Sequence, residues 1–147
     1  MPYKAKVSEI MTSNVFHVSI DDTVHDAELI MKDENVKHIP VLEGRKIVGM
    51  ICDDKIREYT LRNIYESDQN FGEIGFNKIT DFEKIMKEVN HVVYPEDSIA
   101  KAVKLFAKYK LDCLPVVDWE MNLVGLVTHT DILLYFHRFL ENMENQS

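Results

Sequence analysis

The sequence lacks several features that would point to a particular chemistry. Its two cysteines, Cys52 and Cys113, are far apart in the 147-residue chain and form no C-x-x-C pair, which favours reduced thiols in a cytosolic protein. The five glycines are scattered singly, so the sequence contains neither a G-x-x-x-x-G-K-[ST] nor a G-x-G-x-x-G phosphate loop. The six histidines show no H-x-x-x-H spacing, and no metal site is expected.

Basic residues and long apolar runs are also scarce. The chain has 25 acidic against 17 basic residues and a net charge of −8, which argues against a nucleic-acid partner. No apolar run approaches the roughly 18 residues of a membrane span. The N-terminus lacks the apolar centre of a signal peptide, so we expect a cytoplasmic protein. Its length allows one domain or two small ones with a real core.

The stretch Leu123–Asp131 reads L-V-G-L-V-T-H-T-D and predicts a strand that runs directly into a helix. Thr128 and Asp131 would lie at this corner, where free N–H groups and the helix dipole favour an anion. Thr128-x-x-Asp131 also resembles a capping box, which would stabilise the helix without any ligand. From the residues alone both interpretations stay open.

The chain contains an internal repeat, in which similar residues recur in the same order. I-P-V at 39–41 recurs as L-P-V at 114–116, which is 75 positions later. I-V-G-M-I at 47–51 recurs as L-V-G-L-V at 123–127, which is 76 positions later, with the extra residue in a turn. Two copies of one unit are therefore expected.

Each copy predicts a helical lead-in followed by the order β-α-β-β-α. Thr23-x-x-Asp26 resembles a capping box at the start of the first long helix. The short link between the second and third strands implies an antiparallel hairpin. The expected lead-ins are 7–12 and 80–88, the strands 15–18, 39–42, 47–51, 91–94, 114–117 and 123–127, and the later helices 53–65, 98–109 and 130–144. The fold class is α/β (α+β), with repeats at 1–66 and 80–147 and a linker at 67–79.

The last helix has a broad apolar side. Its apolar residues are Ile132, Leu133, Leu134, Phe136, Phe139, Leu140 and Met143. This pattern is most simply core, although a dimer surface is the other interpretation.

The repeated motifs resemble a pair of CBS domains, named after cystathionine β-synthase. They are S-E-I-M-T, D-D-T-V, H-I-P-V-L and I-V-G-M-I in the first copy, and E-D-S-I-A-K-A, C-L-P-V-V and L-V-G-L-V-T-H-T-D-I-L in the second. The resemblance implies that the two units pack through their sheets about an internal pseudo-two-fold axis. It also implies that two chains form a homodimer, that an adenosine-containing ligand binds in a cleft between the units, and that an attached or partner protein is regulated.

The family pattern at the binding corner is Gly, two apolar residues, Thr or Ser, two residues and Asp, and Gly125–Asp131 match it. The resemblance implies that Asp131 binds the two ribose hydroxyls of the ligand, because a carboxylate can accept a hydrogen bond from each of them. The Thr128 hydroxyl would contact phosphate or ribose oxygens, and Thr130 and His129 would contact the phosphates. The other implied contacts are Leu111, Cys113 and His91 around the adenine, Met50 from the other unit, and Lys37 at the phosphates. Leu126, on the strand that leads into the corner, is a further implied ligand contact. Taken alone, His91 is an ordinary strand residue and Lys37 a solvated charge.

The first copy departs from this pattern, because Cys52 replaces the Thr and Lys55 replaces the Asp. Lysine cannot accept hydrogen bonds from a ribose, so we expect one nucleotide site per chain. Lys55 and Arg57 could instead help to neutralise the phosphates of a ligand. Asp53 or Asp54 would still cap the helix that follows.

The favoured function is a non-enzymatic sensor of AMP, ADP, ATP or S-adenosylmethionine that acts on an unidentified protein. The alternatives are a ligand-free dimerisation scaffold and a regulatory piece of a larger transporter or enzyme. Met1 and the polar tail favour a complete small protein over a piece.

Overall fold

A computed structural model describes residues 4–67 and 80–146, so the expected linker, apart from Ser67, lies outside the described residues. The chain divides into two compact units. The central unit comprises residues 16–89, and the C-terminal unit combines residues 1–15 with residues 90–147.

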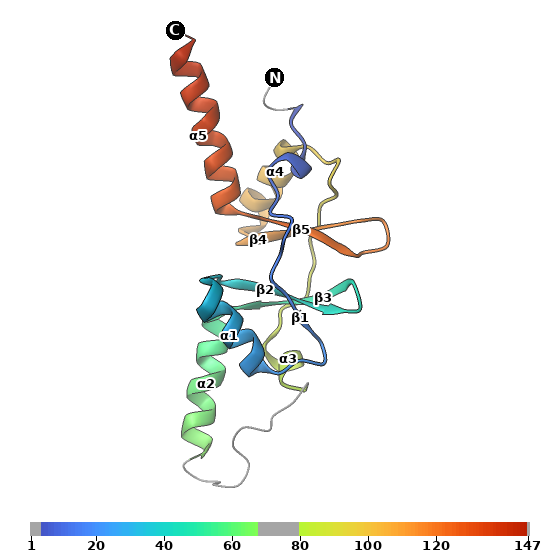
Figure 1. Ribbon diagram of the computed structural model, residues 1–147, viewed down its shortest axis with the longest axis vertical. Helices are drawn as coiled ribbons and strands as arrows, with labels where there is room; N and C mark the ends of the chain where they lie inside the picture. Colours follow the sequence, from blue (N-terminus) through green and yellow to red (C-terminus); the bar gives the residue numbers. More distant parts are fainter. Residues whose placement is uncertain (1–3, 68–79, 147) are drawn as a thin grey trace. The chain divides into compact units, whose positions relative to one another are not determined.

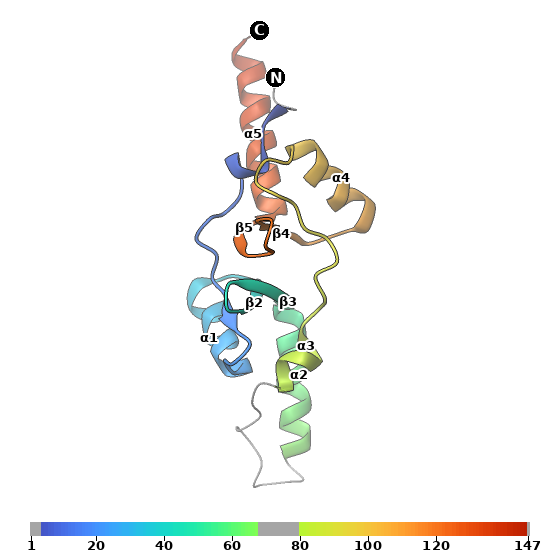
Figure 2. The same ribbon diagram turned by 90° about the vertical axis from the view of Figure 1, so that its right-hand side faces the viewer.

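The central unit contains the complete β-α-β-β-α order expected from the sequence (Figure 1). Its elements are β1 (Val18–Ser19), α1 (Val24–Glu34), β2 (His38–Glu43), β3 (Lys46–Cys52), α2 (Asp53–Ser67) and α3 (Thr80–Ile85). The sheet has the order β1-β2-β3, with β1 parallel and β3 antiparallel to β2. All three helices lie on one face of this sheet (Figures 1 and 2). The first strand begins at Val18 rather than at residue 15.

The C-terminal unit has the same order with one strand missing. It contains a 3₁₀ turn (Val7–Glu9), α4 (Ile99–Tyr109), β4 (Cys113–Val117), β5 (Leu123–Thr128) and α5 (His129–Asn145). The strand expected at 91–94 is wrong, because only Val93 bridges β4. Pro95 follows, and the Tyr94 N–H donates to the Asp97 carboxylate at 2.8 Å, which turns the chain away from the sheet. The mixed α/β class is confirmed.

In each unit, the helix that precedes the hairpin, α1 or α4, starts directly after a capping residue. The Thr23 N–H donates to Asp26 Oδ2 at 2.9 Å, and Thr23 Oγ1 accepts from the Asp26 N–H at 3.1 Å, which confirms the predicted capping box. The hydrogen bond from the Thr23 N–H lowers the pKa of Asp26 below the usual value of an aspartate.

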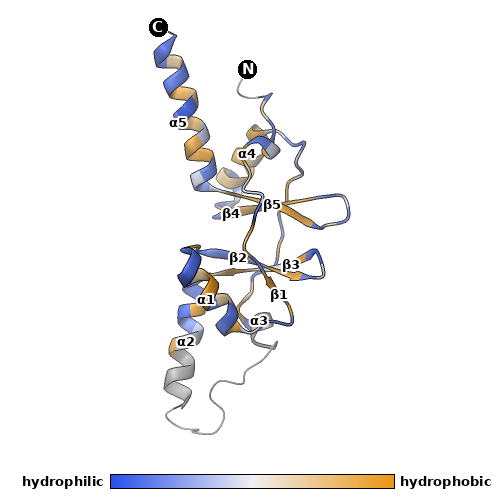
Figure 3. Cartoon of the chain, viewed as in Figure 1, coloured by the Kyte–Doolittle hydropathy of each residue, from blue (hydrophilic) through white to orange (hydrophobic). Residues whose placement is uncertain are grey.

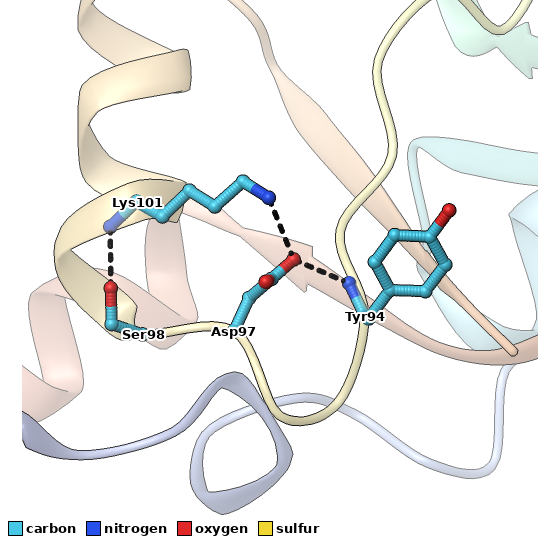
Figure 4. A network of polar contacts seen from close by, with 4 residues as sticks. All are labelled: Tyr94, Asp97, Ser98 and Lys101. Atoms are coloured by element: carbon cyan, nitrogen blue, oxygen red, sulfur yellow. Dashed lines mark hydrogen bonds and ion pairs between the residues drawn. The ribbon is translucent and has the colours of Figure 1, made fainter. Parts of the chain in front are cut away.

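Helix α4 is capped by Ser98, whose hydroxyl accepts from the Lys101 N–H at 3.1 Å (Figure 4). The Asp97 carboxylate stabilises the turn that precedes α4. Its Oδ2 accepts the Tyr94 N–H and also lies 3.2 Å from Lys101 Nζ.

The two lead-in segments pack on the repeat that they do not precede. Thr12 pairs with Leu126 through two backbone hydrogen bonds of 2.9 and 3.0 Å. Lys87 pairs with Met50 in the same way, at 2.8 and 3.0 Å. The N-terminal lead-in therefore belongs structurally to the C-terminal unit, and the second lead-in to the central unit. The two structural units therefore do not coincide with the two predicted repeats. The repeat boundaries describe only where the sequence is duplicated.

Each unit has its own apolar core beneath its sheet. Phe82, Ile39 and Ile51 are fully buried in the central unit. Val7, Leu114 and Val127 are fully buried in the C-terminal unit. Val7 and Phe82 come from the lead-ins, so the exchanged segments supply core side chains to their host units.

The interpretation of the α5 side chains as core is wrong for most of the helix, which has no buried residue. Ile132 packs partly against the core of the C-terminal unit. The exposed residues are Leu133, Leu134, Phe136, Leu140 and Met143. No helix among the described residues is long and apolar enough to cross a membrane.

Candidate functional site

The corner between β5 and α5 is built by the antiparallel β4–β5 hairpin. Thr128 is the last residue of β5, pairs with Cys113 on β4, and is the N-cap of α5. Its backbone is extended, with φ −117° and ψ 172°, so the strand passes into the helix without a loop. The hairpin therefore fixes the position of the first turn of α5, which carries the predicted ligand residues.

Asp131 is held at this corner by three contacts. Its Oδ2 accepts the Thr128 N–H at 2.9 Å and lies 3.4 Å from the Thr128 hydroxyl. Its Oδ1 lies 3.4 Å from the hydroxyl of Thr12, on the N-terminal lead-in. One carboxylate oxygen thus takes part in helix capping, while the other has one long contact with a hydroxyl that water can reach. Capping and ligand binding by Asp131 are compatible in this geometry.

Thr12 is a site residue that the sequence analysis missed. It is separated from Asp131 by most of the chain, and only the exchange of lead-in segments brings the two side chains together. The signal was present in the sequence as the Thr of the S-E-I-M-T motif, but the motif does not say which repeat its lead-in contacts.

Gly125 allows the lead-in to approach the corner closely. A Cβ on Gly125 would lie 2.6 Å from Met11 Sδ and 3.1 Å from the Thr12 carbonyl oxygen. Gly49 occupies the same place in the central unit, where a Cβ would lie 2.4 Å from Met86 Sδ. Each glycine therefore makes room for the methionine of the lead-in that packs on it.

His129 points toward α4 and the segment that follows it. Its Nε2 lies 2.7 Å from the Leu111 carbonyl oxygen, and its ring centroid lies 5.1 Å from that of Phe106 on α4. Because Nε2 faces this carbonyl, the predicted phosphate contact would have to use Nδ1 or another orientation of the ring. Thr130 is exposed beside it, and its hydroxyl has no hydrogen-bond partner among the described residues.

The structure places four of the predicted ligand contacts, Leu111, Cys113, Leu126 and His91, in the C-terminal unit. Leu111 precedes β4, Cys113 begins it, and Leu126 is a buried β5 residue that pairs with Pro115. The ring of His91 stacks on Tyr109 at a centroid distance of 4.0 Å, at the end of α4. The roles of these residues remain predictions.

Lys37 and Met50 belong to the central unit. Met50 is buried on β3, next to Lys87. Lys37 is exposed, and its carbonyl oxygen accepts the Asp53 N–H at 3.0 Å. It lines a cavity of 440 Å³ between α1 and α2. Their roles as ligand contacts also remain predictions.

The corner of the first repeat differs in chemistry, as its sequence indicated. Lys55 Nζ lies 3.5 Å from the Glu58 carboxylate, and Arg57 lies 3.2 Å from Asp53. Both cations are therefore paired along α2, which weakens the idea that they neutralise phosphates. Among the side chains that the structure describes, no cluster of three His, Cys, Asp or Glu residues could hold a metal ion.

Two curated proteins illustrate what the chain is similar to. The CBS domain-containing protein YhcV of Bacillus subtilis is 31% identical over 87% of this chain and 83% of its own length. Inosine-5'-monophosphate dehydrogenase of Korarchaeum cryptofilum is 32% identical over 86% of this chain. That match spans only 23% of the dehydrogenase, so the chain corresponds to a minor part of this relative.

Two solved structures share the fold. The CBS domain pair of protein MJ0100, in complex with 5-methylthioadenosine and S-adenosyl-L-methionine, has a TM-score of 0.71 and 23% identity, over 90% of this chain and 99% of that one. CBSX2 in complex with AMP has a TM-score of 0.72 and 23% identity, over 91% and 97%. The CBS domain model matches residues 7–62 and 81–138, which together make up most of the chain. The chain belongs to the CBS domain family.

Proposed function

We propose that this protein is a regulatory module that binds an adenosine-containing ligand at the corner between β5 and α5. The observation that carries the proposal is the Asp131 carboxylate, which the Thr128 N–H orients through Oδ2 at 2.9 Å. A carboxylate with a fixed orientation and remaining acceptor capacity suits the two hydroxyls of a ribose.

The first turn of α5 offers donors for the rest of such a ligand. The Thr130 hydroxyl and the N–H groups of this turn are suited to phosphate or ribose oxygens. Thr12 lies 3.4 Å from Asp131 Oδ1 and would position the carboxylate or share the ribose with it. Leu111, Cys113 and Leu126 provide apolar surface near the same corner, as an adenine requires.

The ligands of the two solved relatives support this class of ligand. MJ0100 was solved with 5-methylthioadenosine and S-adenosyl-L-methionine, and CBSX2 with AMP. AMP and S-adenosylmethionine are candidates for this chain on this ground, and ADP and ATP are further candidates from the resemblance to the family. Lys37, Met50, His91 and His129 complete the proposed set of contacts.

The ligand would act by shifting a population of conformations. It can shift an equilibrium between two arrangements only by the difference between its affinities for them. A regulated protein, or a second copy of the chain, would then respond to the favoured arrangement.

A ligand-free dimerisation scaffold is the second candidate function, and the exposed apolar residues of α5 favour it. A scaffold needs no ribose site, so the two functions differ in what Asp131 does. A regulatory piece of a larger enzyme is the third reading, which the partial match to the dehydrogenase keeps open.

Thermal melting with AMP, ADP, ATP and S-adenosylmethionine tests the proposal. At a ligand concentration 100 times the dissociation constant, the free energy of unfolding should rise by about 2.7 kcal/mol, because the ligand binds only the folded chain. Guanosine monophosphate, which has the same ribose phosphate, serves as the control for base selectivity. A melting temperature that none of the four adenosine compounds raises contradicts the proposal.

A further inference from the structure

The turn that joins β4 to β5 displays two large apolar side chains to water. Trp119, the only tryptophan in the sequence, is 81% exposed, and Met121 is 38% exposed. Figure 3 shows that the strands of this hairpin are hydrophobic next to the turn, whereas the turn itself is hydrophilic. Trp119 and Met121 therefore stand out on a loop that is otherwise polar.

The backbone of this turn is held in place by Asp118. Its Oδ1 accepts the N–H groups of Glu120 and Asn122 at 2.9 and 3.0 Å, and its Oδ2 accepts the Asn122 side-chain amide at 3.0 Å. The Asp118 N–H donates to the Asn122 carbonyl oxygen at 3.0 Å, which closes the turn. Because the turn is already ordered, it would lose little conformational entropy when a partner binds.

The indole ring of Trp119 is oriented by Tyr94. The two rings stack with a centroid distance of 4.4 Å and an interplanar angle of 22°. The backbone of Tyr94 is itself fixed, since its N–H donates to Asp97 Oδ2 at 2.8 Å (Figure 4). One face of the indole thus covers Tyr94, and the other face is open to water. The stack leaves no slot between the rings, so this surface offers a single flat aromatic face.

The first repeat has no equivalent of this aromatic pair. The offset of 75 positions relates Tyr94 to Ser19 and Trp119 to Gly44. The β2–β3 hairpin nevertheless forms, with its turn at Gly44. The hairpin does not need the stacked rings in order to form, so folding alone does not account for them.

The charged groups next to the aromatic pair in the sequence are mainly acidic. Glu120 follows Trp119, and Glu96 lies two positions after Tyr94; both are exposed. Neither carboxylate makes an ion pair with another described residue. Lys101 Nζ lies 3.2 Å from the Asp97 carboxylate, so this lysine is already paired. The flat aromatic face is therefore accompanied by negative charge that no described cation neutralises.

We propose that this surface, formed by Tyr94, Glu96, Trp119 and Glu120, binds an arginine side chain in an exposed segment of a partner protein. A guanidinium group is planar and stacks on an aromatic face while it keeps its charge for a carboxylate. A second copy of this chain fits less well, because its net charge of −8 would bring like charges together. A neutral sugar would leave both carboxylates without a counter-charge.

The surface is separate from the corner that carries Asp131. The turn and Thr128 lie at opposite ends of β5, so a partner bound at Trp119 leaves the β5–α5 corner accessible. The inference goes beyond the proposed function and does not depend on it.

An NMR titration of the ¹⁵N-labelled full chain with the peptide acetyl-Gly-Arg-Gly-Arg-Gly-amide tests the proposal. The backbone amide signals of residues 94, 96 and 118–122 and the indole N–H signal of Trp119 should shift and saturate. Peptides with lysine or citrulline in place of arginine separate charge from planarity. Lysine keeps the charge and citrulline the plane, so each should bind about 5-fold more weakly.

Three variants assign the contacts. Trp119→Ala should raise the dissociation constant of the arginine peptide about 10-fold, and Glu120→Gln about 3-fold. Glu43→Gln is the matched control, because it removes the same charge from the turn of the first repeat, which has no aromatic residue. It should bind like the unmodified chain. Trp119→Ala should keep the ligand-induced melting shift, so failure of peptide binding and failure of the proposed function are separate results.

Several results would overturn the proposal. They are an arginine peptide that shifts none of these signals, a citrulline peptide that binds as tightly, and a Trp119→Ala variant that keeps its affinity. Shifts of the same signals with protein concentration alone would assign the surface to a second copy of the chain. Equal shifts with maltotriose would assign it to a neutral sugar, and either result also contradicts an arginine-bearing partner.

Discussion

Replacing Asp131 with alanine should weaken binding of the adenosine ligand by about 100-fold or more. The substitution removes a carboxylate that would accept two ribose hydroxyls, and hydrogen bonds to a charged group contribute about 1.5–3 kcal/mol each. The protein should stay folded, because Asp131 is partly exposed and its described contacts are with Thr128 at one helix terminus and, at 3.4 Å, with the Thr12 hydroxyl. Titration calorimetry with the ligand that gives the largest melting shift measures the effect.

Asp26 provides the matched control for Asp131. It caps α1 through Thr23 as Asp131 caps α5 through Thr128, with the same N–H to carboxylate distance of 2.9 Å. Asp26→Ala should lower the free energy of unfolding by about 1 kcal/mol, as loss of a cap does, and leave ligand affinity unchanged. If both variants lost the same ligand affinity, helix capping alone would account for the role of Asp131 at the β5–α5 corner.

Replacing Gly125 with alanine should lower the free energy of unfolding by about 1–3 kcal/mol, the usual effect of overpacking. The new Cβ would lie 2.6 Å from Met11 Sδ, which can move, and 3.1 Å from the Thr12 carbonyl oxygen. That oxygen accepts the Leu126 N–H at 3.0 Å, so the backbone has little freedom to retreat. Chemical denaturation of both proteins gives the difference.

A double-mutant cycle with Met11→Ala assigns the cause. Removing the methionine side chain relieves the overlap, so Gly125→Ala should cost less in the Met11→Ala background than in the unmodified chain. Additivity within about 0.3–0.5 kcal/mol would show that Met11 and Gly125 are not coupled, and the explanation of the glycine would fail.

The repeat and the local signals of the sequence predicted most elements of each unit. The hairpin register follows from alternating apolar residues and a short turn, as in β4–β5. Thr23 and Asp26 marked the start of α1 because capping depends on residues three positions apart. The prediction of a strand at 91–94 is wrong because the turn at Asp97 uses the Tyr94 N–H. The apolar periodicity of the sequence does not reveal this competing hydrogen bond.

The exchange of the lead-ins could not be read from the sequence. A repeat shows that two segments are alike, but either copy offers the same strand edge and the same glycine to a lead-in. Thr12 therefore remained unassigned, although it lies 3.4 Å from Asp131. The sequence also left open whether the apolar side of α5 is core or a contact surface. A helix side that packs on a second molecule has the same periodicity as one that packs on a core.

Counting the ligands bound to each chain distinguishes a sensor with one adenosine site from a ligand-free scaffold. Native mass spectrometry of the purified protein, titrated in turn with AMP, ADP, ATP and S-adenosylmethionine, reports the mass of each bound species. We expect one adduct per chain with at least one of these compounds, and an adduct of the Asp131→Ala variant only at a ligand concentration about 100-fold higher or more. No adduct with any of the four, or two equivalent adducts per chain, would contradict it.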